Sequence, residues 1–182
     1  LTARLPGQAN FSADGQLSTG ESVGFGGPVR LAVGQPAIFA AWWRGKGEVG
    51  AGRLLAPFEL SGRATVTMNG VAVEDMTAAI GDATLKGSIS WAAGDASRTL
   101  RTDLAADRVD FTQVRALAEL LGGRDLRDSS TVADSFQIKL AAGELRIEDL
   151  VMRDVKVDAG FADGGLTVSE IEVGDIGGAR FS

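Results

Sequence analysis

The amino-acid sequence predicts a mainly β protein: a large curved antiparallel sheet, taco- or groove-like, built from repeated β-hairpin units, with one short α-helix. Apolar and polar residues alternate along most of the chain, which is the period of a strand with one buried face. Three dipeptides typical of two-residue hairpin turns separate such runs, at Asp14-Gly15, Asn69-Gly70 and Asp163-Gly164. A helical period replaces the alternation between Phe111 and Leu121.

Length and composition fit one β-rich segment over residues 1–182. A chain of 182 residues can bury a sizeable core, and 25 glycines with 45% apolar residues suit a sheet with many turns. The sequence contains no apolar run long enough to span a bilayer. It begins at Leu1 and carries no signal peptide, so we expect a piece of a longer protein.

Charge and residue types exclude several functions. The net charge of -6 argues against nucleic acid and offers no polybasic surface to anionic lipids. The chain has no Cys and no His, which excludes a thiol nucleophile, a Ser-His-Asp triad and a zinc site of the usual ligands. We therefore expect no enzyme activity, no cofactor and no metal site.

The N-terminal third contains a strand over 1–5, a hairpin at Asp14-Gly15 and an alternating run after Pro28. The segment 37–54 shows no clear period. From Phe58 the alternation is regular, and Gly81 and Gly87 mark bends or bulges within it.

The helix is predicted over about 111–121. Asp110 is an N-cap residue type, and Gln113 stands where a capping box places Glu or Gln. Gly122 and Gly123 are suited to a C-cap. The expected apolar stripe consists of Phe111, Val114, Leu117, Ala118 and Leu121. A charged loop over about 124–134 should be exposed.

The C-terminal strands carry the candidate lining of a binding surface. Their apolar residues alternate with polar ones and should share one face of the sheet. These residues are Phe136, Ile138, Leu140, Leu145, Ile147, Val155, Val157, Leu166 and Val168.

Repetition favours an extendable sheet over a closed one. The hairpins at Asn69-Gly70 and Asp163-Gly164 are each followed by an alternating strand and then Gly-Asp, at Gly81-Asp82 and Gly174-Asp175. Eight strands give an apolar face on the order of 1,100 Å², of which a three-turn helix shields only about 200 Å². The remainder faces a second sheet, as in a closed sandwich or barrel, or holds lipid chains in an open groove; alternation fits both.

Other conspicuous residues have structural explanations. The carboxylates at Glu74-Asp75, Asp107 and Asp110, Asp125 and Asp128, and Glu148-Asp149 stand at expected turns, strand ends and a helix cap. Trp42-Trp43 either anchors a membrane interface or partner, or has one indole packed inward and the other over the sheet edge. Trp91 alternates with Ile89 and should belong to the core.

Four stretches together resemble the AsmA family of Gram-negative envelope proteins, which includes TamB-like members. They are Ala40-Ala41-Trp42-Trp43-Arg44, GDATLKGSISW, TDLAADRVDFTQVRALAELL and LAAGELRIEDLVMRDVKVDAGFADGGLTVSEIEVGDIGGARF. The ordered set, rather than any single motif, carries the resemblance, which is weakest before Ala37. Family members usually have Leu where Phe111 stands.

The resemblance implies a long grooved β-structure in the periplasm, tethered to the inner membrane by a segment outside this sequence. It also implies similarity to bridge-like lipid transfer proteins and a role in phospholipid transport and outer-membrane integrity. We therefore expect a non-catalytic segment that shelters phospholipid acyl chains, in contact with other segments of the same protein and with envelope membrane proteins. The alternative is a closed β-sandwich module that docks an envelope partner protein.

Overall fold

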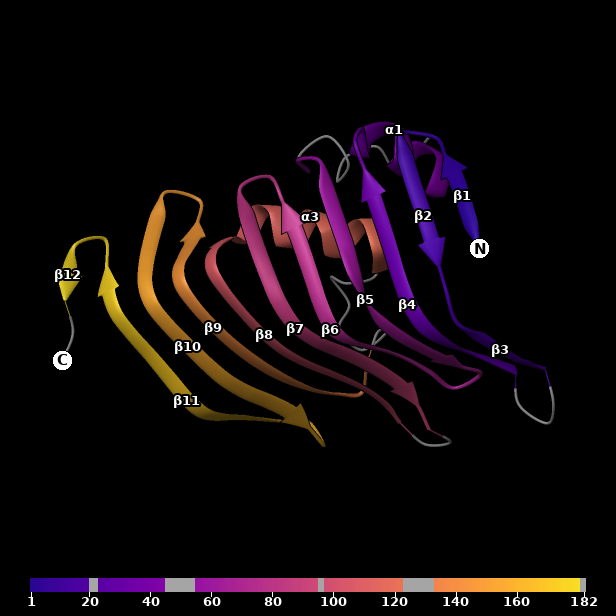
Figure 1. Ribbon diagram of the computed structural model, residues 1–182. Coiled ribbons are helices and arrows are strands. Elements are labelled where there is room, and N and C mark those ends of the chain that lie inside the picture. The colour runs from indigo at the N-terminus through magenta and orange to yellow at the C-terminus, as the bar shows by residue number, and fades with distance from the viewer. Residues whose placement is uncertain (20–22, 45–54, 95–96, 123–132, 181–182) are drawn as a thin grey trace.

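The computed structural model describes residues 1–19, 23–44, 55–94, 97–122 and 133–180. Within these ranges the chain forms one large, open β-sheet with two helices, α1 (Pro36–Trp43) and α3 (Phe111–Gly122) (Figure 1). The strands are β1 (Thr2–Leu5), β2 (Ala9–Ala13), β3 (Gln16–Thr19), β4 (Val23–Val33), β5 (Phe58–Thr67), β6 (Gly70–Ile80), β7 (Ala83–Ala93), β8 (Arg98–Asp110), β9 (Ser135–Ile147), β10 (Leu150–Ala162), β11 (Gly165–Ile176) and β12 (Ala179–Arg180). The mainly β class and the large open sheet predicted from the sequence are confirmed.

The strands follow one another across the sheet in chain order, from β1 to β12, with β2 and β3 both paired to β4. Every described pairing is antiparallel except that of β8 with β9, which is parallel. The prediction of an entirely antiparallel sheet was wrong at this point. A parallel pair needs a long crossover connection, and α3 lies in the connection between β8 and β9.

Two of the three predicted hairpins are confirmed. The Asn69-Gly70 turn joins β5 to β6, and Asp163-Gly164 joins β10 to β11 with φ of +53° and +76°, as a type I′ turn requires. The Asp14-Gly15 hairpin was wrong, because β2 and β3 both pair with β4 and continue along its length. The Asp14 amide donates to the Pro28 carbonyl (3.0 Å), so the dipeptide interrupts one long strand rather than reversing it.

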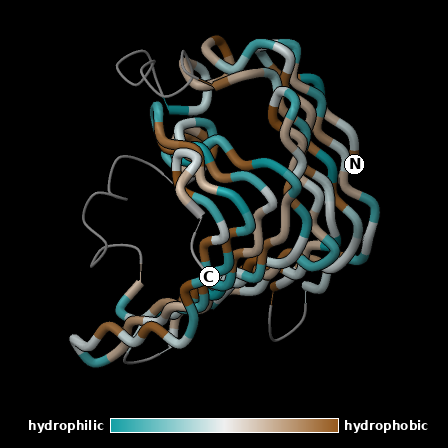
Figure 2. The backbone as a smooth tube through the Cα atoms, turned by 90° about the vertical axis from the view of Figure 1, so that its left-hand side faces the viewer, coloured by the Kyte–Doolittle hydropathy of each residue, from teal (hydrophilic) through white to brown (hydrophobic). Residues whose placement is uncertain are grey.

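The strands bend partway along their length (Figures 1 and 2). Residues of left-handed backbone conformation lie inside strands at the bend: Asp75 (φ +49°), Gly87 (φ +144°) and Asp154 (φ +52°). The pairings of β5 with β6 and of β6 with β7 also shift register here. Such bulges locally increase the bend of a sheet, which explains its curvature.

The core lies on one face of the sheet, toward one end of the strands. Phe39 and Ala40 of α1 and Leu117 and Leu120 of α3 belong to one buried cluster. Its strand members are Ala9, Val33, Phe58, Ala78, Ile80, Leu85, Val109, Ala142, Leu145 and Val155. Both helices therefore cover the same face, and Figure 1 shows α3 behind the strands.

Helix α3 matches its prediction in position but not in orientation. Asp110 caps it, because Oδ1 accepts hydrogen bonds from the amides of Thr112 (2.8 Å) and Gln113 (3.4 Å). Gln113 Oε1 accepts from the Ala56 amide (2.8 Å), which ties the helix to the segment before β5. The buried residues are Ala116, Leu117 and Leu120, whereas Phe111 and Ala118 are exposed.

The buried face of α3 is therefore rotated by about one residue from the apolar stripe that the sequence predicted. The side chain of Leu121, Gly123 and the predicted loop up to residue 132 lie outside the described residues. At the end of that loop, Asp134 forms an ion pair with Arg98 at 3.1 Å.

Helix α1 was missed, and the prediction of a single helix was wrong. Its sequence PAIFAAWW is apolar throughout and has no helical stripe to detect. Pro36 occupies the first turn, where its fixed φ suits a helix start. Arg44 follows the helix and donates from Nε to the Leu120 carbonyl at 3.0 Å, which joins α1 to the last turn of α3.

Candidate functional site

Nine apolar side chains form an unbroken row across nine neighbouring strands, from β3 to β11. Each one is the direct cross-strand partner of the next, so all of them lie on one face of the sheet. We call this the apolar row: Leu17, Phe25, Val66, Val71, Trp91, Leu100, Phe136, Phe161 and Leu166.

A second row lies two residues further along each strand on the same face. It runs through Ala64, Val73, Ile89, Thr102, Ile138, Ala159 and Val168. With strands about 4.8 Å apart, eight spacings make the apolar row roughly 38 Å long, and the two rows stand about 7 Å apart. We call the two rows together the apolar band.

Most of the apolar band is at least partly accessible, and Ala64 in its second row is buried. Leu17 and Leu166, at the two ends of the apolar row, are 68% and 67% exposed, and Val71 near its middle is 42% exposed. None of the nine residues of the apolar row belongs to the buried cluster beneath α1 and α3. The helices thus cover one part of the apolar face and leave this part uncovered by the described elements.

Aromatic rings give the band flat, rigid surfaces. Phe136 and Phe161 stack across β9 and β10, with ring centroids 5.6 Å apart and planes at 16°. Trp91 lies in the middle of the apolar row, between Val71 and Leu100. It is only half-buried and outside the buried cluster, which corrects its assignment to the core.

The opposite face of the sheet is charged. Ion pairs link adjacent strands there: Arg30 with Glu59 (2.7 Å), Lys139 with Asp158 (3.1 Å) and Lys156 with Glu172 (2.7 Å). The hydrogen bond that Lys156 Nζ donates to the Glu172 carboxylate raises the pKa of Lys156. This face is the solvated side of the sheet.

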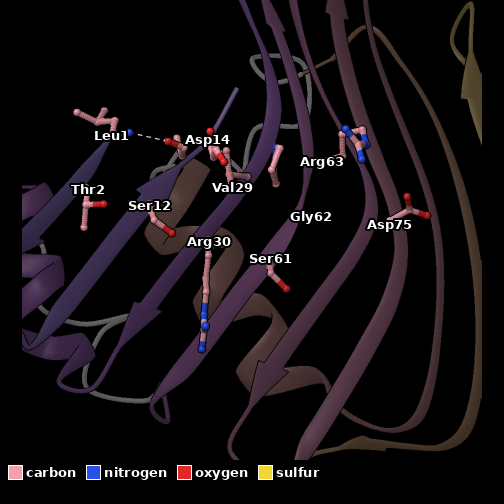
Figure 3. Close-up of a pocket in the computed structure, with 12 residues that line it drawn as sticks. Leu1, Thr2, Ser12, Asp14, Val29, Arg30, Ser61, Gly62, Arg63 and Asp75 are labelled. Carbon is pink, nitrogen blue, oxygen red and sulfur yellow. Dashed lines mark hydrogen bonds between the residues drawn. The ribbon is translucent and has the colours of Figure 1, made fainter. Parts of the chain in front are cut away.

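A hollow of about 670 Å³ lies on the charged face at the bend (Figure 3). Arg30, Ser61, Arg63 and Asp75 are among the side chains around it, and a helix is visible behind the strands. The charged groups of Arg30, Arg63 and Asp75 in this lining favour water over an acyl chain, because they lose hydration when hydrocarbon covers them. The apolar band, on the other side of the sheet, is the stronger candidate for a binding surface.

The structure distributes the nine predicted lining residues over three environments. Phe136, Ile138, Leu166 and Val168 lie in the apolar band, and Leu140 pairs with Val157 immediately beside it. Leu145 and Val155 are buried in the core, and Ile147 faces Leu150 at the far end of the hairpin. The candidate lining is therefore narrowed to the six residues in or beside the apolar band, which are Phe136, Ile138, Leu140, Val157, Leu166 and Val168.

Most of the band was missed from the sequence. The missed members of the apolar row are Leu17, Phe25, Val66, Val71, Trp91, Leu100 and Phe161. Their alternation with polar residues was visible strand by strand. The register that aligns them across the sheet depends on bulges and on the parallel pairing, which alternation does not encode.

The Trp pair of α1 is also on the surface. Trp42 and Trp43 are 45% and 52% exposed, so of the two alternatives the one in which an indole packs inward is wrong. Trp43 stacks on the buried Phe39, with ring centroids 6.2 Å apart. The two indoles form a second exposed apolar site, on the helix.

The conspicuous carboxylates have local structural roles. Asp110 caps α3, Asp75 occupies the bulge of β6, and Glu148-Asp149 forms the turn between β9 and β10. Asp125 and Asp128 lie outside the described residues.

None of the helices in the described ranges is both long and apolar enough to cross a membrane. The resemblance to the AsmA family stays a prediction. No protein-family model, no curated protein and no solved structure matches the chain.

Proposed function

We propose that the chain is a non-catalytic lipid-binding segment whose apolar band shelters phospholipid acyl chains. One observation carries the proposal: the apolar row crosses nine strands without a charged residue, and four of its side chains are exposed while the other five are half-buried. Apolar surface of this extent is uncommon on soluble monomers unless it binds something.

The dimensions of the band suit acyl chains. The acyl chain of one leaflet spans about 15 Å, half of a hydrocarbon core of roughly 30 Å. A row about 38 Å long therefore accommodates such a chain lying across the strands, in contact with about three row side chains at a time. Burial stabilises the complex by about 0.8 kcal/mol for each CH₂ removed from water. A band without charge discriminates little between headgroups.

The resemblance to the AsmA family extends the proposal to a cellular role. In that role the segment is part of a periplasmic conduit that carries phospholipid between the inner and outer membranes and maintains the outer membrane. A row without interruption supports movement along the sheet, since neighbouring positions offer an acyl chain similar contacts.

Trp91 provides a direct test, because the chain contains only three Trp residues. In the variant Trp42→Phe/Trp43→Phe, all indole fluorescence comes from Trp91 in the middle of the row. A fatty acid brominated on its acyl chain should quench this fluorescence with saturation, and non-brominated fatty acid should compete. Fluorescence that stays unquenched, together with no lipid in solvent extracts of the purified chain, would contradict the proposal.

Two adjacent residues of β6 form a matched pair for mutagenesis. Val71→Asp places a charge in the apolar row, whereas Ala72→Asp places the same charge on the opposite face. We expect Val71→Asp to weaken fatty-acid binding at least tenfold and Ala72→Asp to leave it within twofold. Circular dichroism should show the same strand content for both variants.

The alternative function is docking of an envelope partner protein, and the exposed Trp42 and Trp43 favour it. The closed sandwich of that alternative does not form, since the described strands make one open sheet. A docking module predicts that a Trp91→Phe variant shows burial of Trp42 and Trp43 on partner addition, measured as loss of acrylamide quenching. The lipid-binding function predicts that brominated lipid affects Trp91 instead.

A further inference from the structure

Helix α1 presents an apolar side to solvent. Its sequence PAIFAAWW contains no charged and no polar side chain, and Phe39 is buried in the core. The other three large side chains, Ile38, Trp42 and Trp43, are 51%, 45% and 52% exposed. We call these three residues the α1 patch. The outer side of a surface helix is normally polar, so an apolar patch here needs an explanation.

Helix α3, which covers the same face of the sheet, has the ordinary arrangement. Its inner side is buried through Leu117 and Leu120. Its outer side carries an ion pair between Arg115 and Glu119 at 2.9 Å. A helix packed on this face can therefore be polar on its outer side, and packing on the sheet does not account for the α1 patch.

Aromatic contacts hold the α1 patch in place. The ring of Trp43 stacks on that of Phe39 with planes at 7°, and the ring of Trp42 lies 5.8 Å from Phe39 and 6.0 Å from Trp43. The hydrogen bond from Arg44 to the Leu120 carbonyl fixes the end of α1 to α3. Neither indole N–H donates a hydrogen bond to a described residue. The patch is thus a preformed aromatic surface with two N–H donors that can reach water or lipid headgroups.

The size of the α1 patch favours a bilayer over a protein partner. Two half-exposed indoles and one isoleucine expose roughly 300 Å², whereas a stable protein interface takes about 800 Å² from each partner. Shallow insertion into a membrane surface needs only a few side chains, and Trp prefers this half-wet setting. Helix α1 also has no carboxylate that would lose hydration there.

We propose that α1 docks the chain on the surface of a phospholipid bilayer, with the α1 patch inserted among the headgroups. This contact is separate from the acyl-chain binding proposed for the apolar band, because α1 contributes no residue to the band. Helix α1 lies at one end of the strands (Figure 1) and covers the same face of the sheet that carries the band. A docked bilayer and the band therefore lie on the same side of the sheet.

Co-sedimentation of the full chain with vesicles of zwitterionic phosphatidylcholine tests the proposal. The net charge of -6 gives no attraction to anionic headgroups, so apolar insertion has to drive the binding. We expect the chain to bind these vesicles, and we expect high salt to leave the binding intact, because salt screens charges but not apolar contacts.

A matched pair of variants assigns the binding to α1. Ile38→Asp places a charge in the α1 patch, whereas Ala72→Asp places the same charge on the opposite face of the sheet. We expect Ile38→Asp to weaken vesicle binding at least tenfold and Ala72→Asp to leave it within twofold. Circular dichroism should show the same secondary structure for both variants. Equal vesicle binding by Ile38→Asp and the unaltered chain would overturn the proposal.

Fluorescence locates the inserted side chains. In the variant Trp91→Phe, all indole fluorescence comes from Trp42 and Trp43. Vesicles whose phosphatidylcholine is brominated near the headgroup end of the acyl chains should quench it more than vesicles brominated near the chain terminus. Vesicle binding without quenching would place the contact elsewhere on the chain and overturn the assignment to α1. Burial of both indoles in the vesicle-free chain at rising protein concentration would also overturn it, since the occupant would then be a second copy.

Two variants separate this proposal from lipid binding by the apolar band. Ile38→Asp should keep the uptake of a fluorescent fatty acid within twofold while it loses vesicle binding. Val71→Asp should lose fatty-acid uptake and keep vesicle binding. Loss of vesicle binding in Val71→Asp alone would assign the membrane contact to the band and overturn docking through α1.

Discussion

At the scale of single residues, burial in α3 differs sharply between side chains of similar character. Leu120 is 1% exposed, whereas Phe111 at the start of the helix is 46% exposed. Composition and helical spacing identified an apolar stripe but placed it about one residue out of phase. Leu117 and Leu120 join Leu145 and Val155 in one buried cluster, and this tertiary packing selects the face of α3 that is buried.

Truncation of these two side chains should separate their roles. We expect Leu120→Ala to lower the free energy of unfolding by about 2–5 kcal/mol, because it leaves a cavity in a closed part of the core. Phe111→Ala should cost less than about 1 kcal/mol, since half of the ring already contacts water. Urea denaturation measures both, and equal losses would contradict the orientation of α3.

The Arg98–Asp134 pair makes stability depend on pH. Hydrogen bonds from the Arg98 side chain and amide lower the pKa of Asp134 below its ordinary value. A lowered folded-state pKa stabilises the fold above the pKa of the unfolded chain, and this contribution disappears as pH falls through the folded-state value.

Asp134→Asn should therefore be less stable than the unaltered chain at neutral pH. The difference should shrink as the pH falls through and below the usual range of an Asp carboxyl. Thermal unfolding of both chains between pH 7 and pH 2 measures it. A difference that grows toward acid would contradict the pairing.

At the scale of elements, the bend separates the covered and uncovered parts of the apolar face. Gly87 lies at the bend of β7 with φ +144°, and a Cβ atom there would collide with the Asp103 carbonyl oxygen. The close approach of β8 explains why the position has no side chain. The sequence marked Gly87 as a bend or bulge, and the structure confirms the bend.

Gly87→Ala should destabilise the sheet by about 1–3 kcal/mol or more, from backbone strain and the collision with β8. Gly160→Ala is the control, because its added methyl group meets ordinary contact distances and no positive φ. Chemical denaturation compares the two variants. If Gly160→Ala is the more destabilising, the bend does not depend on Gly87.

Single elements were predictable where the signal was local. Asp110 identified the start of α3, and the turn residues identified the hairpins at Asn69-Gly70 and Asp163-Gly164. Helix α1 was not predictable in this way, since a helix that is apolar throughout has no periodic stripe. The prediction of a hairpin at Asp14-Gly15 was wrong because β4 is long enough to pair with both β2 and β3, the strands on either side of this dipeptide.

At the scale of the whole molecule, the sequence predicted a single curved, open sheet but not the alignment of its strands. Phe136 and Leu166 were assigned to one surface from alternation alone, and the register places both in the apolar row. The extension of that surface from Phe136 to Leu17 depends on six successive registers. Each of them is set by tertiary packing, so the full band emerges only in the folded sheet.

The parallel pairing of β8 with β9 also has a consequence for folding. Their partners are 36 positions apart, as in Leu100 with Phe136, whereas most other neighbours are joined by short turns. The segment before α3 and the segment after residue 133 can therefore each form their own strand pairs without the other. The pairing of β8 with β9, which joins the two segments, forms last, because closing the long connection between these strands costs the most conformational entropy. Weakening the pairing of β8 with β9 should split one cooperative unfolding transition into two.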